Sequence, residues 1–342
     1  MRKLIIQIPC YNEEEHLPAV LAALPRTLPG VDAIETLVID DGSWDRTSAV
    51  AGEAGADYLL RFPTHLGLAQ AFSAGMDAAL KLGADIVVNT DADHQYPGDA
   101  IGRLIQPILD GTAEMVIGDR APHRNREFGL GKRILQRVGS WAVRQLSGTD
   151  VPDAASGFRA FSRRAALKLN VLTKFTYTIE TIVQAGKKHI AIAHVPIATN
   201  PSTRPSRLFK SVRTYMRHSA ATLVRIYALY EPLKVFSRIG GTLLFVGVLI
   251  GLRFLAYWAL GDGRGHLQSL ILAAVLIIAG FQTLLIGLVA DLIGSSRALI
   301  EDTLFRVREI ELHLGEGSDV IRLAAPAADA PRATGDVRRA PR

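Results

Sequence analysis

The sequence is poorest in cysteine, with Cys10 alone among 342 residues. One cysteine excludes an internal disulfide framework and any cysteine-rich metal site. The chain also has no Gly-X-Y repeat, and 49% of its residues are hydrophobic, so it is neither fibrous nor disordered over most of its length. Its first apolar run, residues 4–9, is too short for a secretory signal peptide, and we expect the start of the chain to stay in the cytoplasm.

Two phosphate-binding motifs are missing as well. A nicotinamide-dependent enzyme would carry Gly-x-Gly-x-x-Gly after its first strand, but residues 11–14 read Tyr-Asn-Glu-Glu. The Gly-x-x-x-x-Gly-Lys-Ser/Thr phosphate loop is absent from the whole sequence. These absences argue against a dinucleotide dehydrogenase and against a P-loop nucleoside triphosphatase.

Short β-branched apolar runs alternate with helical segments through the first part of the chain. The runs are residues 4–9, 36–41, 58–62, 85–91 and 114–118. Between them, segments such as 14–23 and 69–82 repeat apolar residues every three or four positions, which is typical of amphipathic helices. This alternation predicts an α/β fold, with a mostly parallel sheet flanked by helices on both faces.

The composition changes near residue 201. Residues 204–238 hold eight basic side chains and one acidic one, with apolar residues on a rough helical stripe between them. Two apolar stretches follow, at about 239–260 and 268–291, joined by a short polar turn. About 20 apolar residues suffice to cross a bilayer, whereas a soluble helix of that length normally keeps a polar face. The pattern predicts an interfacial amphipathic segment followed by a two-helix transmembrane hairpin.

Positive charge indicates the orientation of this hairpin. The eight basic residues precede or border the first span, Arg264 lies in the turn, and Arg297, Arg306 and Arg308 follow the second span. The positive-inside rule therefore places the turn outside and both flanks in the cytoplasm. We expect a multi-pass protein of the cell membrane with a cytoplasmic catalytic domain. The net charge of +6 then serves a membrane surface, and no nucleic-acid partner is expected.

These changes in composition predict four regions. Residues 1–203 form a catalytic domain, 204–238 a basic juxtamembrane segment, 239–293 the hairpin, and 294–342 a cytoplasmic tail that becomes disordered from about residue 315. The catalytic motifs described below all precede the hairpin. A chain truncated after Lys234 is therefore expected to fold and to bind nucleotide.

Acidic side chains follow four of the expected strands, and the carboxyl ends of parallel strands meet at one edge of a sheet. They occur in PCYNEE (9–14), DDGS (40–43), DADHQ (91–95) and GDR (118–120). One such acid is usually a helix cap, but four together need a cation, because clustered carboxylates repel one another. Oxygen ligands without a suitable set of His or Cys favour Mg²⁺ or Mn²⁺ over zinc.

Six segments stand in order along the chain: PCYNEEE (9–15), IDDGSWDRT (39–47), HLGLAQAFSAGMDAA (65–79), DADHQYPGD (91–99), GDR (118–120) and DAASGFRAFSRRA (153–165). Together they resemble family 2 glycosyltransferases of the GT-A fold. The resemblance is greatest to the polyisoprenyl-phosphate glycosyltransferases, which include dolichol-phosphate mannose synthases. It covers about residues 3–210 and implies a nucleoside-diphosphate sugar as donor.

The resemblance also implies roles for individual residues. Asp91, Asp93 and Gln95 would bind the metal, and Arg120 would contact the sugar or its phosphates. Asp153 would lie near the reacting carbon and would act as a base if the acceptor is a hydroxyl. Pro9, Tyr11, Glu13, Asp41 and Asp91 would bind the nucleotide sugar, and Ser156 and Arg159 the acceptor. From the charge pattern, Arg204 and Arg207 are expected to attract an acceptor phosphate.

The resulting hypothesis is a membrane-anchored, metal-dependent, inverting transferase. It would move one sugar from a GDP- or UDP-linked donor to a polyisoprenyl phosphate, such as undecaprenyl or dolichyl phosphate, on the cytoplasmic face. Two alternatives stay open: transfer to a hydroxyl of another lipid or glycan, and a non-catalytic membrane scaffold that binds sugar nucleotides. The identity of the sugar and the formation of a homo-oligomer also stay open.

Overall fold

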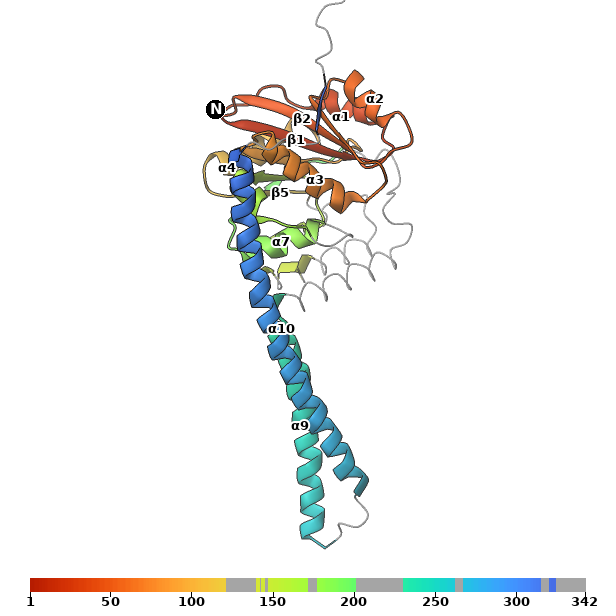
Figure 1. Ribbon diagram of the computed structural model, residues 1–342, viewed down its shortest axis with the longest axis vertical. Helices are drawn as coiled ribbons and strands as arrows, with labels where there is room; N and C mark the ends of the chain where they lie inside the picture. The colour runs from red at the N-terminus through yellow and green to blue at the C-terminus, as the bar shows by residue number, and fades with distance from the viewer. Residues whose placement is uncertain are drawn as a thin grey trace, which may run out of the picture.

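The computed structural model describes residues 1–120, 140–141, 143–144, 147–171, 177–200, 230–261, 267–314 and 320–323. These residues form an α/β domain and two long helices that project from it together (Figure 1). The domain contains a mostly parallel sheet with flanking helices, as the alternation of strands and helices predicted.

One sheet organises the domain. Its described strands lie in the order β7-β5-β6-β4-β1-β2-β3-β8. Their bounds are β1 (Lys3–Cys10), β2 (Ala33–Asp40), β3 (Tyr58–Arg61), β4 (Ile86–Asn89), β5 (Met115–Asp119), β6 (Arg159–Ser162), β7 (Ile192–Pro196) and β8 (Ile321–Arg322). β6 runs antiparallel to β4 and β5, and β8 runs antiparallel to β3, whereas the other pairs are parallel. The five strands expected from the sequence are therefore present, with their carboxyl ends at one edge.

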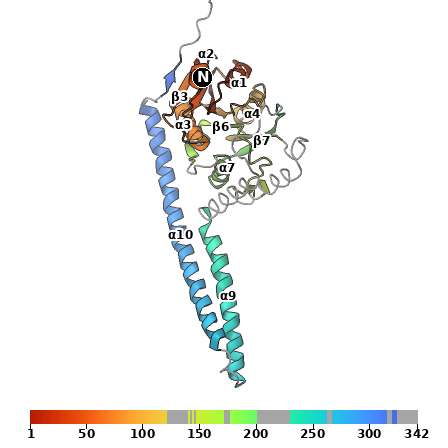
Figure 2. The ribbon, with the colours of Figure 1, turned by 90° about the vertical axis from the view of Figure 1, so that its right-hand side faces the viewer.

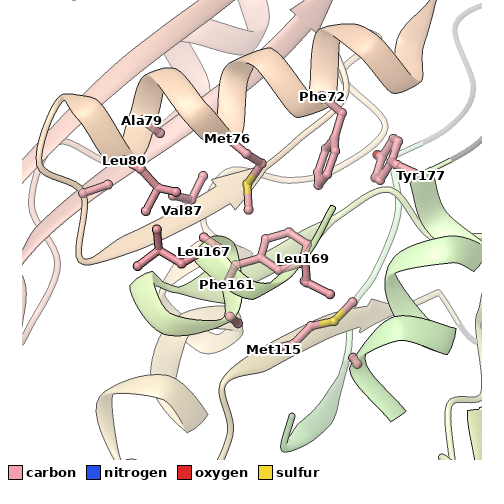
Figure 3. Packing of buried hydrophobic residues seen from close by; sticks show 14 of the residues in the cluster. Phe72, Met76, Ala79, Leu80, Val87, Met115, Phe161, Leu167, Leu169 and Tyr177 are labelled. Carbon is pink, nitrogen blue, oxygen red and sulfur yellow. The ribbon is translucent and has the colours of Figure 1, made fainter. Parts of the chain in front are cut away.

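Helices cover both faces of the sheet and enclose two apolar clusters. Their bounds are α1 (Leu17–Ala23), α2 (Thr47–Glu53), α3 (Leu68–Lys81), α4 (Ala100–Leu109), α6 (Arg163–Lys168) and α7 (Tyr177–Lys187). Side chains alternate along β1, so Ile5 enters one cluster while Leu4 and Ile6 enter the other. In the first cluster the rings of Phe72 and Tyr177 stack, with centroids 4.0 Å apart (Figure 3). This stacking joins α3 to the start of α7.

Two long helices leave the domain side by side (Figure 2). α9 (Pro232–Ala259) has 28 residues and α10 (Leu267–Leu314) has 48. Both are long and apolar enough to cross a membrane, and little of their most apolar part is buried in the protein. At 1.5 Å per residue, α9 is about 42 Å long, which exceeds the apolar core of a bilayer. α9 begins before the first expected span, and α10 continues well beyond the second.

Glycines let the backbones of α9 and α10 approach closely. A Cβ atom built on Gly240 would stand 2.8 Å from the carbonyl oxygen of Gly280, and a Cβ on Gly280 would stand 2.8 Å from the carbonyl of Gly240. Farther along, a Cβ on Gly247 would lie 3.1 Å from the carbonyl of Ala273. Small residues at such contacts are typical of packed membrane helices, since they allow close van der Waals contact. The two helices therefore form a packed hairpin.

The second half of α10 lies against the domain. Three polar contacts join them: Glu311 to Lys81 at 2.9 Å, Glu301 to Lys188 at 2.9 Å, and Arg308 to Asn170 at 2.6 Å. Phe305 and Leu312 pack against the first apolar cluster. Residues 294–314, which the sequence analysis assigned to a tail, are thus a helix docked on α3, on α6 and on Lys188, the residue after α7. The segment docks because apolar residues such as Phe305 and Leu312 are spaced along it between charged ones.

A short strand follows α10. Ile321 pairs with Leu59 of β3, and the N–H of Leu323 donates to the carbonyl of Asp57 at 2.9 Å. Composition did not predict β8, because the surrounding region is rich in Ala, Pro and Gly. The strand covers the outer side of β3, where backbone groups would otherwise be unpaired.

Candidate active site

The loops after β1 and β2 are tied together by their own side chains. Ser43 Oγ accepts a hydrogen bond from the N–H of Asn12 at 2.9 Å, and Asn12 Oδ1 accepts one from the N–H of Trp44 at 3.1 Å. Thr47 Oγ1 accepts from the N–H of Glu13 at 2.9 Å. Asn12 has a φ of 55°, a left-handed conformation that asparagine tolerates better than most residues. These bonds fix the first two strand-end loops as one unit.

Asp41 organises the loop before α3. Its carboxylate accepts hydrogen bonds from the N–H groups of Leu66 at 2.7 Å and Gly67 at 2.9 Å, and it pairs with Nδ1 of His65 at 2.9 Å. The imidazole of His65 in turn stacks on the Tyr11 ring, with centroids 3.9 Å apart. Two residues predicted to bind the nucleotide, Tyr11 and Asp41, are therefore joined through His65, which the sequence analysis did not assign to the nucleotide.

Pro9 and Glu13, two further residues of the nucleotide set, are more enclosed. Pro9 lies inside β1 and is buried, opposite Ile39 of β2. Glu13 is 7% exposed, at the loop that Thr47 holds. Pro9 and Glu13 lie close to the loops that contain Tyr11 and Asp41. These four residues therefore occupy one region of the sheet edge.

Asp91 and Asp93 follow β4 at the same edge. Burial first, and then the neighbouring Asp93 carboxylate, raise the pKa of Asp91 to about 7, against the opposing charges of Arg120 and Arg159. Asp93 Oδ1 accepts a hydrogen bond from the N–H of Gln95 at 3.2 Å. The raised pKa means that burial and the Asp93 charge together outweigh the positive charges of Arg120 and Arg159 at the Asp91 carboxylate.

The residues present fit a divalent cation. Asp91 and Asp93 supply oxygen ligands, and an ion between them would offset both the burial of the Asp91 charge and its repulsion from Asp93, which together raise the pKa of Asp91. Among the described residues, no group of three or more His, Cys, Asp or Glu is arranged to hold an ion without help. Mg²⁺ is commonly held by one or two carboxylates together with substrate phosphates. The geometry therefore suits an ion shared with a bound diphosphate.

Arg120 and Asp153 form a bidentate ion pair. Arg120 Nε donates to Asp153 Oδ2 at 2.7 Å, and a terminal guanidinium nitrogen donates to Oδ1 at 3.0 Å. The side chain of Asp153 is 2% exposed and that of Arg120 is 14% exposed. Parallel hydrogen bonds of this kind fix the plane of the guanidinium. The structure thus brings together the two residues that the sequence analysis assigned to catalysis.

Gly157 lies directly against Asp91. A Cβ atom built on this glycine would stand 3.0 and 3.1 Å from the two carboxylate oxygens of Asp91 and 2.8 Å from Tyr177 Oη. The N–H of Gly157 donates to Tyr96 Oη at 3.2 Å. A side chain at position 157 would push the loop away from Asp91, so the close approach requires glycine.

A chain of buried polar side chains reaches this loop from the middle of the sheet. Gln7 Nε2 in β1 donates to Asn89 Oδ1 in β4 at 2.9 Å. Asn89 Nδ2 then donates to the Gly157 carbonyl at 2.9 Å and to Tyr177 Oη at 3.0 Å. Buried polar groups are costly unless they are hydrogen-bonded. The sequence analysis missed this chain, although a glutamine and an asparagine inside two apolar strands are its signal.

Arg159, predicted to bind the acceptor, is fully buried. Its guanidinium donates to the Ser156 carbonyl at 2.8 Å, the Thr178 carbonyl at 2.7 Å, Thr181 Oγ1 at 2.6 Å and the Ala154 carbonyl at 3.0 Å. Burial lowers the pKa of Arg159 to about 10, which leaves it charged at neutral pH. Its described contacts tie the loop after Asp153 to α7. Ser156 is also buried, and its Oγ has no hydrogen-bond partner within the described part of the chain.

Comparison with known protein families shows to which family this chain belongs. The family described as Glycosyl transferase family 2 matches residues 5–169. The undecaprenyl-phosphate mannosyltransferase of Micrococcus luteus is 33% identical over 58% of this chain and 83% of its own length. The UDP-N-acetylglucosamine–dolichyl-phosphate N-acetylglucosaminyltransferase of Methanococcus voltae is 30% identical over 56% of this chain and 83% of its own. The chain belongs to glycosyl transferase family 2.

A solved structure supports the fold of this glycosyltransferase. Glucosyl-3-phosphoglycerate synthase from Mycobacterium tuberculosis, crystallised with Mn²⁺, uridine diphosphate and phosphoglyceric acid, superposes with a TM-score of 0.52. The superposition covers 66% of this chain and 78% of the other, at 22% identity. The similarity shows that the glycosyltransferase has a GT-A-like sheet.

The family match covers most of the predicted site but not all of it. Every predicted site residue from Pro9 to Arg159 lies inside the matched segment. Arg204 and Arg207, like most of the predicted segment 204–238, lie outside the residues that the structure describes. Their proposed contact with an acceptor phosphate stays a prediction for this glycosyltransferase.

Proposed function

We propose that this glycosyltransferase moves one sugar from a nucleoside diphosphate to a polyisoprenyl phosphate. The observation that carries the proposal is the cluster of Asp91, Arg120, Asp153 and Gly157 at one sheet edge, in a domain held by two helices long enough to cross a bilayer. The names of the two relatives, a mannosyltransferase and an N-acetylglucosaminyltransferase of polyprenyl phosphates, support a lipid-phosphate acceptor.

The donor would lie across the ends of β1, β2 and β4. Tyr11, stacked on His65, would offer an aromatic face to the base, with Pro9, Glu13 and Asp41 around the base and ribose. Asp91, Asp93 and Gln95 would hold Mg²⁺ or Mn²⁺ next to the diphosphate. Such an ion offsets the negative charge that develops on the departing nucleotide. Arg120, fixed by Asp153, would add its own charge to the same end of the leaving group.

The pairing of Arg120 with Asp153 favours a phosphate acceptor over a hydroxyl. A phosphate monoester is mostly dianionic at neutral pH and can attack without giving up a proton. A hydroxyl needs a general base, and both oxygens of Asp153 already accept bonds from Arg120. In this proposal Asp153 positions Arg120, and attack from the face opposite the leaving group inverts the sugar carbon. Ser156 and the loop held by Arg159 would border the acceptor, with Arg204 and Arg207 attracting its phosphate.

We further propose that the catalytic domain faces the cytoplasm. α9 starts and α10 ends at the domain, so one side of the membrane holds both flanks of the hairpin (Figure 2). Lys234 and Arg238 lie near the start of α9, and Arg297, Arg306 and Arg308 lie in the domain-side half of α10. This distribution of positive charge agrees with a cytoplasmic domain under the positive-inside rule.

Transfer assays with the full-length protein in detergent test the proposal. Radiolabelled UDP- and GDP-sugars are each incubated with a polyprenyl phosphate, the matching free polyprenol, or no lipid, with Mg²⁺, Mn²⁺ or a chelator. We expect a lipid-extractable product that needs both the phosphate and a divalent cation. A product formed equally well on the free polyprenol would assign the enzyme to hydroxyl acceptors, and nucleotide binding without any transfer would indicate a scaffold.

A further inference from the structure

The domain-side half of α10 carries an apolar stripe on its outer face. Ile300, Val307, Ile310 and Leu314 are 67%, 53%, 59% and 72% exposed, and Leu299 is 72% exposed. The opposite face of the same segment contacts the domain through Glu301, Phe305 and Arg308. Glu311 reaches Lys81 from the border between the two faces. The stripe therefore lies at the level of the catalytic domain and outside the apolar core of the bilayer. Large apolar side chains aligned over several turns in water usually mark an interaction site.

The spacing of this stripe is that of a coiled coil. Ile300, Val307 and Leu314 repeat every seven residues, and Thr303 and Ile310 fall between them at the second core position of each heptad. The first core position is β-branched at 300 and 307, and the second holds Thr303 and Ile310. Core side chains with this spacing are buried between two helices of the same kind rather than against a flat surface.

The same register continues toward the membrane. Ser296 takes the core position before Ile300. Ile293, Val289 and Ile286 take the three core positions before Ser296 and are 65%, 56% and 55% exposed. They line a shallow apolar groove of about 320 Å³ together with Leu285 and Ala290. Glycine and alanine are scarce on this outer face, whereas the face toward α9 has Gly280 and Ala273. The outer face thus offers one seam from the bilayer to the end of the helix, apolar at every core position except Ser296 and Thr303.

We propose that α10 pairs in parallel with α10 of a second copy of this chain, along the seam from Ile286 to Leu314. Two copies in one membrane share the same orientation, so their α10 helices can meet only in parallel. Charge at the border of the seam agrees with this pairing. In a parallel pair, Arg306 of one copy lies beside Glu311 of the other, five residues on, and Leu299 lies beside Leu304. Within its own chain Arg306 pairs with Asp302 and Glu311 pairs with Lys81, both at 2.9 Å, and the side chains of Arg306 and Glu311 remain 73% and 32% exposed. The proposal goes beyond the transfer reaction and does not depend on it.

Cysteine cross-linking in native membranes tests the pairing. The only native cysteine, Cys10, is 2% exposed, so an introduced thiol is the only accessible one. Val307→Cys places the thiol at a core position, where the two copies bring their Cβ atoms close together. Glu309→Cys is the matched control, since it lies two residues on and points to another side of the helix. We expect a disulfide-linked dimer under mild oxidation for V307C and at most a small fraction for E309C.

The mass of the purified particle provides a second test. The full-length protein in nanodiscs or mild detergent is expected to be dimeric, and the double variant Val307→Glu, Ile310→Glu monomeric, with an unchanged melting temperature of the catalytic domain. The variant Glu309→Ala should remain a dimer. Equal cross-linking of V307C and E309C, or a wild-type particle that is monomeric at micromolar concentration, would overturn the proposal. Labelling of V307C by a bilayer-resident probe in a monomeric particle would assign the stripe to lipid instead.

Discussion

Asp41 and Arg159 act on the backbone of the loops beside them. Asp41 accepts from two successive N–H groups at the start of α3, and Arg159 donates to three carbonyl groups near the loop that contains Gly157. Arg120 and Asp153 fix each other in the same way, through two bonds. Substitutions at these positions therefore change where a loop lies as well as what a substrate touches.

The metal assignment makes a direct prediction. Asp93→Asn removes one of the two carboxylates after β4, so it should abolish metal-dependent donor binding and lower turnover by about 10²–10³-fold, the usual cost of losing one electrostatic contact to developing charge. Asp99→Asn is the matched control, because Asp99 is exposed and its side chain does not cap α4. Titration calorimetry with UDP or GDP, with and without Mn²⁺, measures the effect. Normal Mn²⁺-dependent binding by D93N would contradict the assignment.

Tyr177 is predicted to be a positioning residue for the reaction. Tyr177→Phe removes the hydroxyl that accepts from Asn89 and lies beside Gly157, and the loop should then move relative to Asp91. We expect kcat to fall by about tenfold, the equivalent of one hydrogen bond, with little change in the donor KM. Tyr58→Phe, a buried tyrosine on β3, is the control. A loss of thermal stability with unchanged kcat would mean that Tyr177 serves packing alone.

Arg207 is expected to act on the acceptor. Arg207→Ala should raise the apparent KM for a polyprenyl phosphate by about ten- to a hundredfold, the worth of one charge-assisted hydrogen bond, and leave the donor KM unchanged. Lysine should restore only part, because it cannot bind two phosphate oxygens in one plane. Steady-state kinetics with donor and acceptor varied separately distinguish the outcomes. A change in donor KM alone would move Arg207 to the nucleotide, and no change would assign it to the membrane surface.

At the scale of elements, the sequence predicted best where the signal was local. Each of β1 to β5 is a short, mostly apolar run, β-branched in all but β3, and each was expected close to where it lies. β6 was missed, because its four residues begin at Arg159 in a segment that reads as a loop and its antiparallel partners are far away in sequence. The contact between Asn89 and Tyr177 could not be predicted from the sequence either, since it depends on how β4 and α7 pack.

The close contact between Gly240 and Gly280 in the hairpin leads to a prediction at the scale of elements. Gly280→Leu should push α9 and α10 apart, because even a Cβ atom at this position would lie 2.8 Å from the backbone carbonyl of Gly240. The cost of such overpacking is typically about 1–3 kcal/mol. Gly241→Leu should be tolerated, because no atom of the described residues lies within 4 Å of a Cβ built there. Helix separation can be followed by spin labels in nanodiscs, and equal behaviour of the two variants would refute the packing.

For the whole molecule, the structure changes the expectation for truncation. Removing everything after Lys234 takes away Phe305 and Leu312 from the first apolar cluster and leaves Lys188 without Glu301. It also uncovers β3, the partner of β8. We now expect the truncated domain to be less stable than the same domain in the full chain.

A shortened hairpin tests this expectation. Replacing residues 241–279 by a short glycine-rich turn keeps the docked half of α10 and β8, because α9 and α10 meet at Gly240 and Gly280. The shortened protein should melt at the temperature of the full chain and bind nucleotide, whereas the truncated one should melt several degrees lower. Equal melting temperatures would show that the docked segment adds no stability.

β8 also has a consequence for synthesis on the ribosome. The edge beside β3 receives its last strand only when residues near 321 have been made, after the whole hairpin has left the ribosome. Domains generally fold as their segments emerge, but this sheet stays one strand short until the hairpin has entered the membrane. Completion of the catalytic domain thus follows insertion, so chains that fail to insert would present an open strand edge that quality-control proteases and chaperones can recognise.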